Sequence, residues 1–199
     1  MPMIHRPALL LVGLQVGYDA PGFGRRGNPG LEAVLAAVLT GWRERGHPVI
    51  HVRHVPRSPT SPLWPGAGGS DWKAQVAPRS GEPVIETSTQ GAFIGTSLEA
   101  DLRERYVDTV VIGGLTTNHA VSSTARNAAD LGFATVVLSD GSAAFERRGG
   151  DSAEVVHAMA LADLRDGIAK VSDSRTVLAD LARGIRSVEA GLRLRWEPI

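Results

Sequence analysis

Short apolar runs alternate with amphipathic segments along most of this chain, and this alternation limits the fold more than any other feature. Six of the runs are short enough to be single buried strands. They cover residues 8–13, 49–52, 83–86, 109–113, 135–138 and 168–171. Helix-like segments separate most of them, as in βαβ units. We therefore predict a three-layer α/β/α sandwich around a six-stranded, mainly parallel sheet. The strand order that we expect, 3-2-1-4-5-6, is the common order of doubly wound sheets.

Capping signals predict where the helices begin. Asn28-Pro29 predicts an N-cap followed by proline at the first helical position. Thr96-x-x-Glu99 and Asp151-x-x-Glu154 are capping boxes for two further helices. Another helix is expected from 119 to 131, where Gly132 ends it.

The stretch 55–82 shows no periodic pattern. It is rich in proline and glycine and contains Trp64 and Trp72. A loop this long inside a compact domain is usually a functional cover or a partner surface rather than a linker. Since neither side of it could close a core alone, we predict one domain over residues 1–185.

The C-terminal tail, residues 186–199, follows a final helix that is expected to end near 184. Its Leu192, Leu194 and Trp196 alternate with polar residues. This pattern indicates an edge strand or an arm that docks on another subunit.

Composition excludes several classes of function. The 199 residues carry 21 Lys+Arg and 21 Asp+Glu, so the formal net charge of zero gives no electrostatic sign of nucleic-acid or membrane binding. The chain has no cysteine, which excludes disulfides, thiolate metal sites and thiol nucleophiles. The apolar run 8–14 is too short to span a bilayer, and we expect a cytoplasmic protein.

The chemistry is expected at the carboxyl edge of the sheet, where open parallel sheets bind ligands. The segments 12–15, 86–96 and 113–120 converge there in the predicted topology. The last of them enters a helix, so backbone N–H groups near Thr116 and Ala120 are predicted to face the cleft. Such donors suit an oxyanion or a polarised carbonyl.

A set of motifs in fixed order gives the chain a family resemblance. The motifs include ALLLVGLQ at 8–15, GAFIGTSLEADL at 91–102 and GGLTTNHAVSSTARNAADLGF at 113–133. With them the chain resembles the isochorismatase-like cysteine hydrolases, which include nicotinamidases and N-carbamoylsarcosine amidase. The resemblance covers about residues 8–181. It implies a homo-oligomer, a dimer or larger, and a cis peptide near Leu115-Thr116.

The resemblance also implies a catalytic aspartate, lysine and cysteine, but other residues stand at the matching positions. In the family the cysteine attacks an amide carbonyl, the aspartate takes its proton, and the lysine orients or charge-balances the site. The motifs place Gly13, Thr87 and Ala120 at these positions. An engineered Cys-to-Ala change would explain Ala120 alone. Because none of the three side chains can replace its counterpart, we predict that the covalent amidase mechanism does not operate.

Nine residues are candidates for ligand binding in the predicted cleft. They are Gln15, Trp64, Gln90, Phe93, Thr116, Thr117, Asn118, His119 and Ala120. The alternative to ligand binding is a structural hydrogen bond for Gln15 and packing within the long loop for Trp64. His119 is either structural or the remaining general base. Thr116 or Thr117 as a substitute nucleophile would need an adjacent base, and the sequence shows none.

No cofactor or metal is predicted. His51 and His54 are three residues apart, so in a strand they face opposite sides and make a poor metal pair. One is expected in the core and the other in a loop. The partner predicted from the cleft is a small molecule.

Three hypotheses about function remain at this point. The first is a repurposed enzyme that performs a non-covalent isomerisation, cyclisation or elimination on a small carbonyl metabolite. The second is a catalytically inactive homologue that binds a metabolite. The third is a structural subunit of an active relative, which predicts a filled cleft and a large apolar interface.

Overall fold

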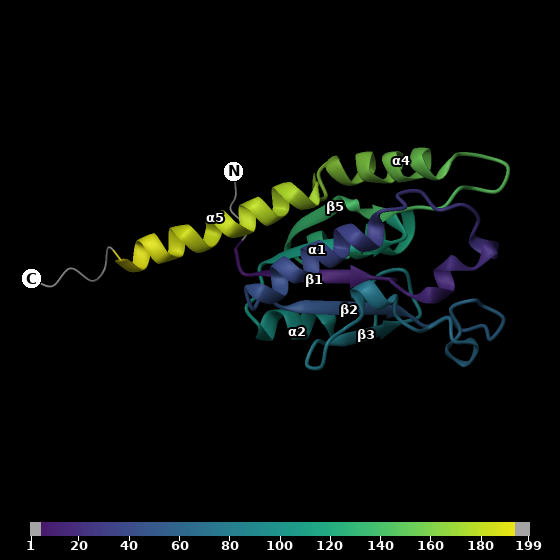
Figure 1. The fold of residues 1–199 in the computed structure, drawn as a ribbon, viewed down its shortest axis with the longest axis horizontal. Helices are drawn as coiled ribbons and strands as arrows, with labels where there is room; N and C mark the ends of the chain where they lie inside the picture. The colour runs from purple at the N-terminus through teal and green to yellow at the C-terminus, as the bar shows by residue number, and fades with distance from the viewer. Residues whose placement is uncertain (1–4, 194–199) are drawn as a thin grey trace, which may run out of the picture.

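The computed structural model describes residues 5–193, and it describes the side chains of residues 5–183 except that of residue 67. Its centre is one sheet of six strands in the order β3-β2-β1-β4-β5-β6 (Figure 1). The strands are β1 (Pro7–Val12), β2 (Val49–His54), β3 (Val84–Thr87), β4 (Thr109–Leu115), β5 (Ala134–Ala143) and β6 (Lys170–Ser172). Every neighbouring pair is parallel. The predicted fold class and strand order are confirmed.

Strand β1 lies in the middle of the sheet, between β2 and β4, and all six of its residues are buried. Because successive side chains of a strand point to opposite faces, Leu10 and Val12 enter one apolar core cluster and Leu9 and Leu11 the other. A strand buried on both faces reads as a continuous apolar run, which is how the sequence marks it.

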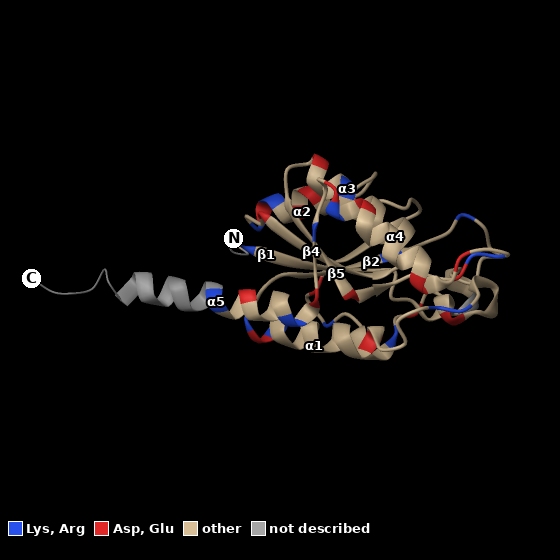
Figure 2. Cartoon of the chain, turned by 90° about the horizontal axis from the view of Figure 1, so that it is seen from above, with Lys and Arg blue, Asp and Glu red and all other residues tan. Residues whose placement is uncertain are grey.

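Helices cover both faces of the sheet (Figure 2). On one face lie α1 (Leu31–Glu44) and α5 (Ser174–Arg193), and on the other lie α2 (Leu98–Glu104), α3 (Ser122–Asp130) and α4 (Ala153–Arg165). Among the described residues, no helix is long and apolar enough to cross a membrane.

Helix α1 begins later than its capping signal predicts. It starts at Leu31, and Gly30 is its N-cap. Asn28 has a φ of 47°, and its side-chain amide donates to the carbonyls of Asp140 (2.7 Å) and Ser142 (3.1 Å). The prediction of an Asn28 cap was wrong because Asn28 has a left-handed backbone conformation and its side-chain amide donates to carbonyls of β5.

The two predicted capping boxes are also wrong in detail. Helix α2 begins at Leu98, while the Thr96 hydroxyl donates to the carbonyl of Ala92 at 2.6 Å. Helix α4 is capped by Ser152, one residue after Asp151, and its hydroxyl accepts from the N–H of Val155. The Thr96 hydroxyl accepts from the N–H of Leu98, and Ser152 replaces Asp151 as the cap of α4, so the motif locates the helix start only to within a residue or two.

The C-terminal tail continues α5 instead of forming an edge strand. The helix extends to Arg193, so Leu192 is helical, and the edge-strand prediction is wrong there. Extending an existing helix costs less than starting a strand, since the nucleus is already formed. Leu194 and Trp196 lie outside the described residues, and docking of the tail on another subunit stays a prediction.

The long loop 55–82 contains two 3₁₀ turns, η3 (Pro65–Ala67) and η4 (Ala74–Val76). Ion pairs anchor it. The ammonium of Lys73, only 9% exposed, lies 2.5 Å from a carboxylate oxygen of Asp19 and 3.2 Å from one of Glu32. These contacts hold the loop against the segment after β1 and the start of α1.

Candidate functional site

A cavity of about 550 Å³ lies at the carboxyl edge of the sheet, beyond the ends of β1 to β5. It is lined by Tyr18, Gly22, Phe23, His54, Ser61, Leu63, Gln90, Thr116, Asn118, His119, Phe145, Glu146 and Arg147. Four of the sequence candidates are among them, namely Gln90, Thr116, Asn118 and His119. Parallel topology brings them together, because all strand ends meet at this edge.

The inner wall of the cavity is formed by Thr116 and the turn η5 (Thr117–Val121), which follows β4 directly. The Leu115-Thr116 peptide is cis, as the resemblance implies. The carbonyl of Thr116 accepts from the N–H groups of His119 (3.2 Å) and Val121 (3.1 Å). The turn thereby presents a hydroxyl, an amide and an imidazole to a ligand: Thr116 is buried, Asn118 half-buried and His119 exposed.

Thr117 does not line the cavity but anchors η5 from behind. Its hydroxyl is completely buried and lies 2.7 Å from Nδ1 of His157 on α4. Nε2 of His157 lies 3.0 Å from the carbonyl oxygen of Ser139. Because a carbonyl can only accept, Nε2 carries the hydrogen and Nδ1 accepts from Thr117. Burial lowers the pKa of His157, which favours this neutral form.

The three positions that the sequence motifs predict to match the family's catalytic residues lie in closed surroundings. Gly13 follows β1 with a φ of 65°, and a Cβ there would lie 2.4 Å from the carbonyl oxygen of Leu115. The hydroxyl of Thr87 accepts from the N–H of Thr89 at 3.0 Å and closes a local turn. Ala120 is 8% exposed and belongs to the core cluster on the α2–α4 face.

His54 enters the cavity at the end of β2 and is held there by Gln15. The Gln15 side chain is fully buried; its amide donates to the carbonyl of His54 at 3.0 Å and accepts from its N–H at 2.8 Å. Burial lowers the pKa of His54, although a backbone hydrogen bond with Thr89 opposes this. Gln15 therefore positions a cavity residue and does not itself face the cavity.

The two strand histidines have separate environments. His51 is fully buried, and its Nε2 lies 2.9 Å from a carboxylate oxygen of Glu82, whereas His54 is half-buried beside the cavity. No group of three His, Cys, Asp or Glu side chains in the described part of the chain is placed to hold a metal ion.

The aromatic wall differs from the one that the sequence indicates. Tyr18, Phe23 and Phe145 line the cavity with ring centroids 5.0–6.1 Å apart. Phe93 instead packs against Phe133 in the core at 6.0 Å, and Trp64 lies in the long loop without lining the cavity. Burial raises the pKa of Tyr18 to about 12, so its phenol keeps its proton at neutral pH.

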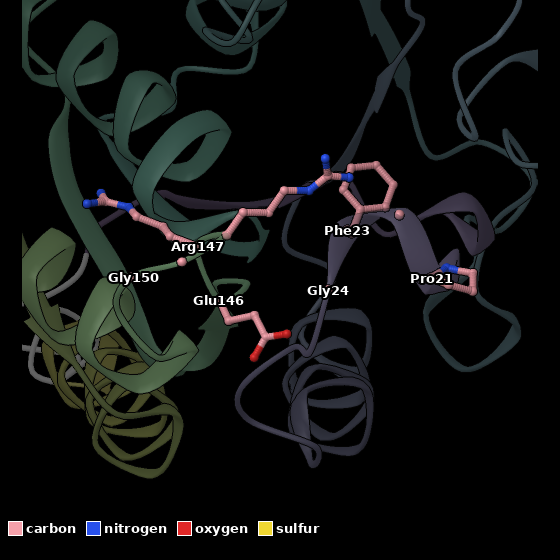
Figure 3. Close-up of a pocket in the computed structure, with 9 residues that line it drawn as sticks. Pro21, Phe23, Gly24, Glu146, Arg147 and Gly150 are labelled. Carbon is pink, nitrogen blue, oxygen red and sulfur yellow. The ribbon is translucent and has the colours of Figure 1, made fainter.

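A second pocket of about 420 Å³ adjoins the first and shares Gly22, Phe23, Glu146 and Arg147 with it. We call the first the inner cavity and the second the outer pocket. Figure 3 shows Glu146, Arg147 and Gly150 on one side of the outer pocket and Pro21, Phe23 and Gly24 on the other. The first group follows β5, and the second belongs to the 3₁₀ turn η2 (Pro21–Phe23) and its end.

Sequence reasoning missed several lining residues, among them Tyr18, Phe23, His54, Phe145 and Arg147. His54 had a usable signal, since it ends a parallel strand at the carboxyl edge. For Phe145 and Arg147 there was no such signal, because both lie well beyond the end of the predicted strand 135–138. Strand β5 continues past a register shift to Ala143, and this extension carries them to the cavity.

Comparison with known proteins agrees with this geometry. The model of the isochorismatase domain matches residues 7–176. The isochorismatase family protein YrdC of Bacillus subtilis is 35% identical over 185 residues, which cover 91% of this chain and 99% of YrdC. The maleamate amidohydrolase of Pseudomonas putida is 30% identical over 151 residues, or 67% of this chain and 70% of that enzyme.

A solved structure gives the same picture. An isochorismatase-family structure from Chromobacterium violaceum superposes with a TM-score of 0.84 at 40% sequence identity, covering 92% of this chain and 100% of the other. The family model matches most of the chain, and YrdC and the Chromobacterium violaceum structure align over nearly their full length. The chain belongs to the isochorismatase family.

Proposed function

We propose that this chain has lost the covalent amide chemistry of its family and uses the inner cavity to convert a small carbonyl compound without a covalent intermediate. One contrast carries the proposal. The positions that the motifs match to the catalytic residues hold Gly13, Thr87 and Ala120, none with a titratable side chain. Beside them a cavity of about 550 Å³, with several polar side chains in its lining, remains open.

The closed surroundings of these positions support the loss of the covalent mechanism. Gly13 has a left-handed φ of 65° and no room for a Cβ, so an aspartate does not fit this backbone. The Thr87 hydroxyl is engaged in its own turn. Both lysines lie outside the cavity lining, and Lys73 is paired with Asp19 and Glu32.

The groups that line the inner cavity suit proton transfer next to a carbonyl. Neutral imidazole is a general base at physiological pH, and burial lowers the pKa of His54. Thr116 and Asn118 line the same cavity and supply donors for the oxygen of an enolate. In an isomerisation His54 would take the α-proton and return it at another carbon, so that no co-reactant is consumed.

The open cavity also bears on the other two hypotheses. A structural subunit would be expected to fill or collapse the cleft, and the cavity argues against that role. A metabolite-binding protein without turnover would use the same cavity as the proposed enzyme. The enzyme changes the compound that it binds, whereas the binding protein releases it unchanged.

The loss of amidase chemistry is tested with amide substrates of the family. Purified protein is incubated with maleamate, nicotinamide and N-carbamoylsarcosine, and released ammonia is measured. We expect no ammonia above the buffer blank, from the natural chain or from Ala120→Cys, because the variant still lacks its base and lysine. Ammonia release by the natural chain would overturn the proposal.

Turnover is tested with a small-molecule extract of the source cells, incubated with and without the protein and analysed by mass spectrometry. A compound that is consumed and replaced by an isomer, or by a product lacking water, supports the enzyme. A compound that is retained unchanged supports the binding protein instead. Gly22→Phe is the blocked variant, since Gly22 lines both pockets and a Cβ there meets nothing within 4 Å.

The matched control adds bulk at the other edge of the sheet. Tyr106 precedes β4 and is 74% exposed, so Tyr106→Trp should leave binding and conversion unchanged. Conversion that survives Gly22→Phe at the natural rate would place the reaction outside the inner cavity.

A further inference from the structure

The outer pocket continues the inner cavity toward solvent. The two share Gly22, Phe23, Glu146 and Arg147, so one ligand can extend from Thr116 and Asn118 into the outer pocket. An inner cavity that takes a carbonyl group leaves the outer pocket for the other end of the same molecule.

Two arginines give the outer pocket its charge. Arg147 and Arg148 both line it, and its one carboxylate is that of Glu146. That carboxylate accepts from the backbone N–H of Arg25 at 3.0 Å and lies 3.9 Å from the Arg25 guanidinium. Glu146 is therefore oriented by the opposite segment, and the arginines are left to meet a ligand.

Neither arginine is strongly engaged. The guanidinium of Arg147 lies 3.4 Å from a carboxylate oxygen of Asp151, and both side chains are about half exposed, a geometry that contributes little. Arg148 forms no ion pair with any residue that the structure describes within 4.0 Å. An anionic ligand can recruit both without displacing a buried partner.

A tight turn holds the two arginines at the pocket. The N–H of Gly150 donates to the carbonyl of Arg147 at 3.1 Å, and the N–H of Arg147 donates to the carbonyl of Asp151 at 3.0 Å. Gly149 has a φ of 70°, which favours glycine, and a Cβ there would meet nothing within 4 Å. The turn thus fixes the backbone under the arginines and leaves space for a ligand.

We propose that the outer pocket binds the anionic oxygens, carboxylate or phosphate, of a ligand whose carbonyl end lies in the inner cavity. The inference rests on the proposed function and narrows its substrate class to small oxo acids or oxo phosphates. Guanidinium groups recognise both anions through paired hydrogen bonds.

The test compares probes that differ in charge. The dissociation constants of 4-oxopentanoate, its methyl ester and 3-oxobutyl phosphate are measured by calorimetry at low salt. We expect each anion to bind about fivefold more tightly than the neutral ester. Added sodium chloride should weaken the anions and leave the ester unchanged. The anion with the lower dissociation constant shows whether the outer pocket prefers a carboxylate or a phosphate.

Substitutions assign the effect to the outer pocket. Arg148→Gln should remove most of the preference for the anions, Arg148→Lys should keep part of it, and the double change with Arg147→Gln should abolish it. Arg105→Gln is the matched control, an exposed arginine at the opposite edge of the sheet with no ion pair among the described residues. It should leave all three constants unchanged.

Two outcomes would overturn the inference in different ways. If acid and ester bind equally and Gly22→Phe abolishes both, the inner cavity binds carbonyl compounds but the outer pocket does not select charge. If none of the probes binds, the ligand class assigned to the two pockets is wrong. The extract experiment still decides the proposed function in either case, because it uses no chosen ligand.

Discussion

Strands β1 and β4 are neighbours in the sheet, and their carboxyl ends differ in what they offer a ligand. β1 ends at Gly13, whose backbone conformation leaves no room for a side chain. β4 ends at Thr116 and η5, where side chains line an open cavity of about 550 Å³. One strand end is closed, and the other is built around hydrogen-bond donors.

This difference separates two parts of a catalytic site that are usually treated together. A nucleophile and its base need titratable groups, whereas stabilising an oxyanion needs only fixed donors. Here the donor wall, formed by Thr116 and η5, lies beside the end of β1. That strand end cannot carry a carboxylate in its present conformation. Retention of the donor wall is what favours non-covalent carbonyl chemistry in the inner cavity.

The largest effect is expected from Gly13→Asp, which forces the closed strand end to resemble the family's motif. A Cβ at 2.4 Å from the carbonyl oxygen of Leu115 requires the backbone to shift. We expect a loss of about 3 kcal/mol in the free energy of unfolding, measured by urea denaturation.

The control for this change is Gly22→Ala, at a glycine where a Cβ meets nothing within 4 Å. It should stay within about 0.5 kcal/mol of the natural chain. A Gly13→Asp protein of natural stability, or one that hydrolyses maleamate once Ala120→Cys is added, would break the comparison between the two strand ends.

The next effect concerns His54, the proposed base in the inner cavity. His54→Gln should reduce the rate constant for the conversion found in the extract by about a hundredfold, as expected for loss of a general base. The Michaelis constant should change little, since the amide keeps a similar shape. His119→Gln, at an exposed position of the same cavity, should reduce the rate far less. The reverse ranking would assign the base role to His119.

A smaller effect is expected from Thr117→Val, which unties the donor wall from α4. The change removes the hydroxyl that Nδ1 of His157 accepts from and leaves that buried nitrogen unpaired. We expect a loss of about 1–2 kcal/mol in stability. Thr40→Val, at an exposed helix hydroxyl that bonds only its own helix, should cost almost nothing. Equal losses in the two variants would contradict an anchoring role for Thr117.

The smallest effect is a pH dependence of stability. Burial lowers the pKa of His51, His54 and His157 in the folded protein. As the pH falls below about 6.5, the unfolded chain takes up protons at these residues while the folded chain resists. Stability should therefore decline from pH 7 to pH 5.5 in urea titrations. A His157→Gln variant should show a shallower decline, and an unchanged slope would exclude His157 as a contributor.

Local pattern and tertiary contacts account for different parts of the molecule. The buried strands could be predicted because apolar runs of strand length have few alternatives between helical segments. The helix start at Asn28 was misplaced because its side chain bonds to carbonyls of β5. The starts at Thr96 and Asp151 were misplaced because these side chains contact Ala92 and Arg147, four residues earlier in the chain. Capping signals are local, and a tertiary acceptor can outcompete them.

The site divides in the same way. Gln90, Thr116, Asn118 and His119 could be predicted, since they follow strands whose ends must meet at one edge. Gln15, Trp64 and Phe93 were plausible by position, but their side chains point into the core or the loop. Which side of the backbone faces a cavity depends on packing from other elements.

By itself the sequence determined the parallel sheet, and it showed that the chain contains no thiol and almost no lysine. These properties follow from composition and hydrophobic periodicity, which need no long-range contact to be read. Only the tertiary structure decided that Gly13 is closed, that Gln15 holds His54, and that the extension of β5 brings Arg147 to the inner cavity. Each of these depends on atoms far apart in the chain approaching within a few ångströms, and no local pattern encodes that distance.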